Sequence, residues 1–186
     1  MPDTLLSRVP PDQMPEGVRL AWDALNELTG EATFVEVFAK APELLDFTMV
    51  KFYQEIFFNG RVDERYKQLA RLRLSMNHGC RTCNLQNLAG VAETGYSPEQ
   101  IDAMWRQDYS DFGDDEAAVM ELADEIALNN DQGKLTEALH EKLRCHFSEE
   151  DILELGLCLA VIVGLVKLSF VFGLVQKEEY CRFSTQ

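Results

Sequence analysis

The sequence predicts an all-α protein, and three observations lead to that prediction. Apolar residues recur at helical spacing along most of the 186 residues. Helix start and stop signals bracket these segments, as in Ser97-Pro98-Glu99-Gln100, which combines an N-cap, a proline at the first helical position and a capping-box Gln. No segment alternates apolar and polar residues between turns, as a half-buried strand would.

The expected helices follow one another after an irregular arm. Four prolines lie within the first 17 residues, so we expect an arm over residues 1–17 and a single domain over residues 18–186. A short helix after Ser97 carries Ile101, Met104 and Trp105. The other predicted helices are Glu16–Leu28, Pro42–Phe58, Asp63–Met76, Cys80–Glu93, Asp114–Asn129, Thr136–Cys145 and Phe147–Val175.

Two of these helices are unusually apolar. The Pro42–Phe58 segment has too many apolar residues for one narrow stripe, so we expect it to be deeply buried. From Leu155 to Val175 the chain is apolar for a length that would span a bilayer. Lys167 lies inside that run, three glycines interrupt it, and no basic flank marks a cytoplasmic side, so we expect a core or interface helix.

Composition narrows the classes of function. The hydrophobic share of 46% is enough for a packed core, which argues against disorder. The net charge of −15 repels phosphate groups, so we expect no nucleic-acid partner and no docking on anionic membranes. The first residues lack the apolar core of a secretory signal, which predicts a cytoplasmic protein whose five cysteines are mostly reduced.

The main chemical signal is the pair Cys80 and Cys83. Residues three apart on a helix share a face, at a distance over which two sulfurs can bond. If the helix begins at Cys80, its unpaired N–H groups and positive dipole end lower the thiol pKa, and Arg81 adds positive charge. One thiolate can then attack a peroxide or a disulfide while the other resolves the product to an internal disulfide.

The cysteine pair has three alternative explanations. The two cysteines can be ordinary buried small residues, because free Cys is often buried. A zinc site needs four ligands, and only one pair is local; Cys145 and His146 are adjacent, which suits one metal poorly. A thioredoxin fold would place the motif after a strand, whereas a helix precedes it here. We expect no cofactor and no bound metal.

The block GRVDERYKQLARLRLSMNHGCRTCNLQNLAGVAETGYSPEQIDAM places the cysteine pair at the start of a second predicted helix. It resembles the AhpD core, in which Cys-x-x-Cys opens a helix, and the chain is similar to the peroxidase-related branch of the carboxymuconolactone decarboxylase / alkylhydroperoxidase D (AhpD)-like superfamily. The downstream DDEAAVMELADEIA and LTEALHEKLRCHFSEEDILELGLCLAVIVG follow the same branch, so that the resemblance covers about residues 60–175. It implies an all-helical subunit that forms a dimer, trimer or hexamer, with a thiol active site.

The resemblance also implies roles for individual residues. Cys83 would meet the peroxide and Cys80 would resolve it. The AhpD pattern places a Glu twelve residues before the first cysteine and a His four residues after the second, as a proton relay. This chain has Gln68 and Asn87 there, and neither can act as an acid or base near neutral pH. His78, which can titrate near pH 7, and Glu64, one turn before Gln68, are the candidate replacements.

Three hypotheses for function follow. The first is a thiol oxidoreductase that cycles Cys80 and Cys83 to reduce hydroperoxides or protein disulfides, with an unknown thiol reductant as its electron source. The second is a redox sensor or binding protein that kept the disulfide and lost the relay. The third is a decarboxylase-type enzyme whose activity would survive the loss of both cysteines.

Overall fold

The computed structural model describes residues 2–92 and 94–183, and over this part of the chain it is helical without a β-strand. A single isolated bridge pairs Cys80 with Lys177. The elements in chain order are η1 (Pro11–Gln13), α1 (Glu16–Thr29), α2 (Thr33–Phe38), α3 (Pro42–Asp46), η2 (Phe47–Phe58), α4 (Glu64–His78), α5 (Arg81–Ala92), α6 (Pro98–Trp105), α7 (Asp114–Ile126), α8 (Glu137–Arg144) and α9 (Glu149–Phe172). The predicted all-α class is confirmed.

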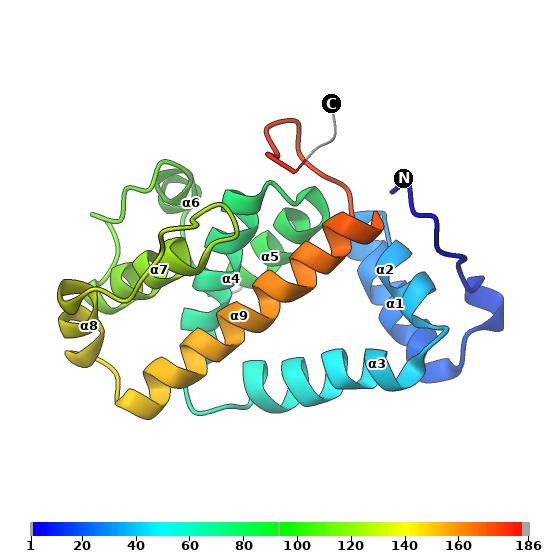
Figure 1. Cartoon of the computed structure of the whole chain (residues 1–186), viewed down its shortest axis with the longest axis horizontal. Coiled ribbons are helices and arrows are strands. Elements are labelled where there is room, and N and C mark those ends of the chain that lie inside the picture. Colours follow the sequence, from blue (N-terminus) through cyan, green and yellow to red (C-terminus); the bar gives the residue numbers. More distant parts are fainter. Residues whose placement is uncertain (1, 93, 184–186) are drawn as a thin grey trace.

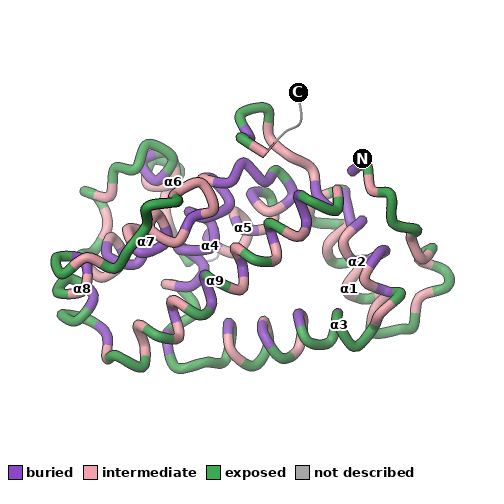
Figure 2. The backbone as a smooth tube through the Cα atoms, viewed as in Figure 1, coloured by how far each residue is buried: buried purple, intermediate pink, exposed green. Residues whose placement is uncertain are grey.

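Helix α4 is the centre of the molecule. It packs against α5, α6, α7, α9 and η2, and every residue from Lys67 to Met76 is buried. Figure 1 shows α9 crossing in front of α4 and α5, with α3 and η2 along the lower edge and α1 and α2 at the N-terminal end. In Figure 2 the purple of buried residues is concentrated on α4 and its neighbours, while the outer side of α3 and η2 is largely green.

Local capping chemistry explains most helix boundaries. Gly30 ends α1 in the left-handed conformation, and full capping boxes at Ser97 and Ser148 begin α6 and α9. Helix α4 continues two residues beyond the predicted Met76, because Gly79 supplies its C-cap. The predicted end of the next helix at Glu93 lies outside the described residues. The six-residue α2 was not predicted, because it is too short to show a helical period.

The expected deep burial of residues 42–58 is wrong. The segment is helical over the predicted range, but it winds as a π-helix from Phe47, and only one side is buried, by Leu45, Thr48, Phe52 and Phe57. The other side carries exposed apolar residues: Leu44 (53% exposed), Phe47 (58%) and Phe58 (43%). Apolar content alone therefore did not distinguish a core helix from one with an apolar outer face.

Helix α9 has the length and apolar composition of a bilayer-spanning helix, and 39% of its most apolar window is buried inside the protein. The buried side packs on α4, α7 and η2 through Leu155, Cys158, Leu159, Ile162 and Val166. The opposite side leaves Leu153, Leu157, Val171 and Phe172 exposed. Lys167 lies on that exposed side, with its ammonium over the ring of Phe183.

Candidate functional site

The turn between α4 and α5 holds both cysteines. Gly79 adopts a φ of 66°, and a side chain at this position would approach the Cα atom of Cys181 to 2.8 Å. Only glycine fits such a close, left-handed turn. Cys80 follows directly and Cys83 lies in the first turn of α5. The predicted position of the cysteine pair at a helix start is confirmed.

The two sulfurs are bonded to each other but differ in access. Cys80 and Cys83 form a disulfide with their Cα atoms 5.2 Å apart. Cys80 is fully buried, within an apolar cluster that includes Val166, Phe170 and the free thiol of Cys181. Cys83 is only partly buried. A molecule that approaches the disulfide or the reduced pair therefore meets the sulfur of Cys83 first.

The backbone N–H groups at the start of α5 are less available than the sequence suggested. The C-terminal segment folds over this end, and the carbonyl of Gln176 accepts hydrogen bonds from the N–H groups of Arg81 (2.9 Å) and Thr82 (3.5 Å). The N–H of Cys83 donates to the sulfur of Cys80 at 3.2 Å. The Arg81 side chain is exposed and pairs with Glu178 at 3.7 Å. Of the N–H groups and the arginine charge that were expected to act on the two sulfurs, one N–H group, that of Cys83, donates to the sulfur of Cys80.

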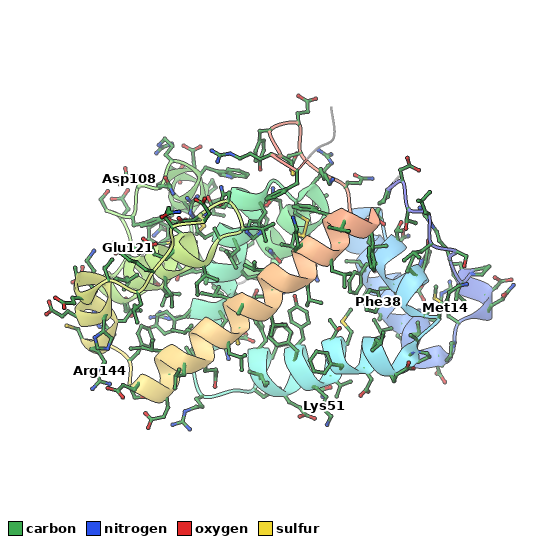
Figure 3. The ribbon with its side chains drawn as sticks, in the orientation of Figure 1. Met14, Phe38, Lys51, Asp108, Glu121 and Arg144 are labelled. Atoms are coloured by element: carbon green, nitrogen blue, oxygen red, sulfur yellow. A yellow bond between two sulfur atoms is a disulfide. The ribbon has the colours of Figure 1, made fainter. Side chains whose placement is uncertain are left out.

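Cys83 opens onto a cavity of about 390 Å³ between α1, η2, α4, α5 and α9. This volume lies in the range of roughly 300–1,000 Å³ that is usual for small-molecule sites. Figure 3 shows side chains of η2 and α9 pointing into the space between these helices, with Lys51 directed away from it. The lining is mostly apolar and includes Leu25, Leu28, Phe34, Met49, Tyr53, Phe58, Ile162, Leu165, Val166 and Val175.

Polar side chains also line the cavity: those of Thr48, Gln54, Arg71, Ser75, His78, Thr82, Gln86, Asn87 and Ser169. Asn87 is buried and donates from Nδ2 to the carbonyl of Arg71 at 3.2 Å. Gln68 is buried behind this wall, and its Oε1 accepts from Nη2 of Arg71 at 2.6 Å. The structure thus brings Gln68 and Asn87 to the same arginine, and neither side chain can exchange a proton near neutral pH.

The two candidate replacements for the relay do not supply it. The expectation that His78 titrates near pH 7 is wrong, because burial lowers its pKa to about 4. Its Nε2 accepts the N–H of Leu128 at 2.9 Å, so the ring is neutral with its proton on Nδ1. His78 does line the cavity. Glu64 is exposed at the first position of α4 and does not line the cavity.

Arg71 is the site residue that the sequence analysis missed. It is 5% exposed and lines the cavity that contains Cys83. Its spacing of three from Gln68 was the available signal, since residues three apart on a helix can pair. The sequence did not indicate that this arginine is buried, because charged residues on a helix usually face water.

Two of the three other cysteines, Cys145 and Cys158, lie apart from this chemistry. Cys145 is exposed and carries a free thiol. Cys158 is buried in the main core, and burial raises the pKa of its thiol to about 11. Among the described residues no group of three or more His, Cys, Asp or Glu side chains is arranged to hold a metal ion.

Solved structures with the same architecture place the protein in a structural class. A protein from Ralstonia eutropha JMP134 described as an alkylhydroperoxidase AhpD core and uncharacterized peroxidase-related protein superposes with a TM-score of 0.71 at 15% identity, covering 96% of this chain and 94% of that one. A peroxidase-related protein from Silicibacter sp. TM1040 gives 0.69 at 16% identity, with 97% and 96% covered. The fold is therefore AhpD-like.

A further structure with this fold is that of a debrominase. The debrominase Bmp8, as a cysteine-to-alanine variant in complex with 2,3,4-tribromopyrrole, gives a TM-score of 0.68 at 18% identity, with 97% of this chain and 95% of that one covered. At these identities the likeness establishes the fold alone. No curated protein matches the chain. Residues 42–125 match the sequence model of the carboxymuconolactone decarboxylase family.

Proposed function

We propose that this protein is a thiol oxidoreductase that reduces a hydroperoxide, or another protein's disulfide, by cycling Cys80 and Cys83. The observation that carries the proposal is the asymmetry of the pair: one sulfur lines an apolar cavity and the other is buried directly behind it. This is the arrangement that an attacking and a resolving cysteine require. The match of residues 42–125 to the carboxymuconolactone decarboxylase family model and the peroxidase-related structural neighbours also support a thiol oxidoreductase.

The peroxide reaction balances with the residues in place. The Cys83 thiolate attacks the outer oxygen of ROOH, the O–O bond breaks, and the alkoxide leaves as ROH after taking a proton from water. Cys83 is then a sulfenic acid. The Cys80 thiol displaces water from it and forms the disulfide. A dithiol reductant restores both thiols by exchange, and Cys83 is the sulfur that this reductant reaches.

A second candidate function is supported by the chemistry that the cavity lacks. Gln68 and Asn87 cannot carry protons, and His78 is neutral and already accepts a hydrogen bond. A pair without a proton relay would oxidise slowly and act as a redox sensor rather than as a turnover catalyst. Such a sensor would use the backbone hydrogen bonds that hold the C-terminal segment against the start of α5. In these bonds the carbonyl of Gln176 accepts from Arg81 and Thr82, and the N–H of Glu178 donates to the carbonyl of Gly79, so all of them lie beside Cys80.

A peroxide titration of the reduced protein tests the first candidate. We expect two thiols to be lost per equivalent of cumene hydroperoxide, with the new link mapped to Cys80–Cys83. Cys83→Ser should abolish the reaction, whereas Cys80→Ser should react once and stop at the sulfenic acid. Cys145→Ser is the matched control, since it removes an exposed thiol outside the cavity and should leave the rate unchanged.

The outcomes separate the candidates. Sustained turnover with dithiothreitol supports the enzyme. Oxidation of the pair without sustained turnover supports the sensor, provided that protection of the 176–181 segment from proteolysis changes with redox state. Activity toward a lactone acid that persists when both cysteines are replaced would instead support the decarboxylase alternative and overturn both thiol proposals.

We also propose that the protein is a homo-oligomer. The support is the exposed apolar side of α9, formed by Leu153, Leu157, Val171 and Phe172, together with Leu44, Phe47 and Phe58 on the outer side of α3 and η2. Large apolar side chains exposed in groups on a protein surface often mark protein–protein interaction sites. Light scattering should show a dimer, trimer or hexamer, and Leu157→Lys should shift the mass toward the monomer. A monomer at micromolar concentration would refute this proposal.

A further inference from the structure

Three basic side chains are buried on α4, and they differ in their partners. Lys67 pairs with Glu154 at 3.1 Å and Arg73 pairs with Asp124 at 2.6 Å. Arg71 has no carboxylate within ion-pair distance anywhere in residues 2–92 and 94–183. A buried charge normally requires a paired and hydrogen-bonded partner. Arg71 is the exception among the three.

What surrounds Arg71 offsets its charge only in part. Its guanidinium lies 5.0 Å from the ring centre of Phe57 and 5.8 Å from that of Tyr53, which provides cation–π attraction. The amide oxygen of Gln68 accepts one hydrogen bond. The Nε–H is buried with no acceptor among the described residues. The group therefore retains both an uncompensated positive charge and an unused donor.

The position of Arg71 defines one end of the cavity. A Cβ atom added at Gly90 of α5 would lie 3.3 Å from Nη2 of Arg71, so the guanidinium lies next to Gly90. Cys83 is seven residues earlier on the same helix, about 10 Å away along its axis at 1.5 Å per residue. Apolar side chains from α1, η2 and α9 line the cavity that Arg71 and Cys83 share.

We propose that this cavity binds a monocarboxylate with an apolar chain, whose carboxylate pairs with Arg71 while the chain extends toward Cys83. A carboxylate matches the fork of guanidinium donors and supplies the missing charge. The apolar walls suit an aliphatic or aromatic chain that spans about 10 Å. The proposal deepens the proposed function and rests on it for the reacting group: the substrate becomes the hydroperoxide of an apolar acid.

Binding of octanoate, compared with octan-1-ol, tests the charge requirement without any redox chemistry. We expect calorimetry on the wild-type protein to show at least about tenfold tighter binding of octanoate, because only the carboxylate can form charge-assisted hydrogen bonds with the guanidinium. Equal affinities for the two, or no binding of octanoate, would overturn the proposal.

Variants locate the site. Arg71→Met should weaken octanoate binding roughly ten- to hundredfold and leave octan-1-ol unaffected. Arg144→Met is the matched control, because it removes the charge of an exposed arginine outside the cavity, and both affinities should stay unchanged. An unchanged octanoate affinity in folded Arg71→Met would place the ligand elsewhere and refute the assignment. Circular dichroism and thermal unfolding establish that each variant is folded.

Gln68→Glu keeps the proposal testable if Arg71→Met does not fold. The new carboxylate takes the place of an amide that lies 2.6 Å from the guanidinium, so it should compete with the ligand. Octanoate affinity should fall at least about tenfold, which follows from the same charge-assisted bond. Undiminished octanoate binding in this variant contradicts the proposal.

The two proposals fail separately. Oxidation of the cysteine pair by cumene hydroperoxide, which carries no charge, reports on the thiol chemistry alone. If octanoate binds as expected and the pair does not react, the anion site stands and the oxidoreductase proposal fails. If the pair reacts and octanoate does not bind, the oxidoreductase stands and the substrate class proposed here is wrong.

Discussion

Replacing His78 by Gln should remove a specific pH dependence from the stability of the protein. The histidine is 1% exposed, and burial lowers its pKa from 6.5 to about 4. The unfolded chain binds this proton at a higher pH than the folded chain, so stability is full above pH 6.5 and falls as the pH drops toward 4. With about 1.36 kcal/mol per pKa unit, the loss is about 2 kcal/mol at pH 5 and about 3 kcal/mol at pH 4.

Urea unfolding of wild type and His78→Gln between pH 7.5 and pH 5 measures this difference. The Gln oxygen can accept the Leu128 N–H in place of Nε2, and carboxylates common to both proteins cancel in the comparison. We expect wild type to lose about 2 kcal/mol more than the variant by pH 5. The matched control is His146→Gln, an exposed site that should keep the wild-type curve. Parallel curves for wild type and His78→Gln would refute the neutral, buried assignment of His78.

Three further predictions concern the stability of the helices and the turn around the site. Glu154→Gln should destabilise the protein by about 3–5 kcal/mol in urea unfolding, because it leaves buried Lys67 without its carboxylate; adding Lys67→Met should recover much of that loss. Gly79→Ala should cost at least about 2 kcal/mol, since φ is 66° and the new methyl meets the backbone of Cys181; a stability equal to wild type would contradict the close approach. Ser148→Ala removes the N-cap of α9 and should cost about 1 kcal/mol in thermal unfolding, with no change in peroxide reactivity.

The helices could be predicted because their boundaries depend on residues close together in the sequence. The environment of the candidate site could not, because it depends on contacts between distant segments. Capping residues such as Ser97 and Ser148 act within one turn, so the sequence located those helix starts correctly. The cysteine pair is equally local. By contrast, the burial of His78, and the capture of the α5 N–H groups by Gln176, depend on segments far apart in the chain. The sequence around Arg71 does not indicate that this side chain is buried without a carboxylate partner among the described residues, because that depends on distant segments.

Position 68 links the chemistry of the thiols to the charge in the cavity. A glutamine there cannot relay a proton, which counts against rapid turnover, and the same neutral amide leaves Arg71 unneutralised. One residue therefore accounts both for the missing acid and for the available anion site. Gln68→Glu should move two measurements in opposite directions: octanoate binding should weaken, and oxidation of the cysteine pair by a neutral hydroperoxide should become faster if proton supply limits it. A parallel change in both would mean that the amide acts only through the packing of α4 on α5, and that the site has no separate roles for charge and proton.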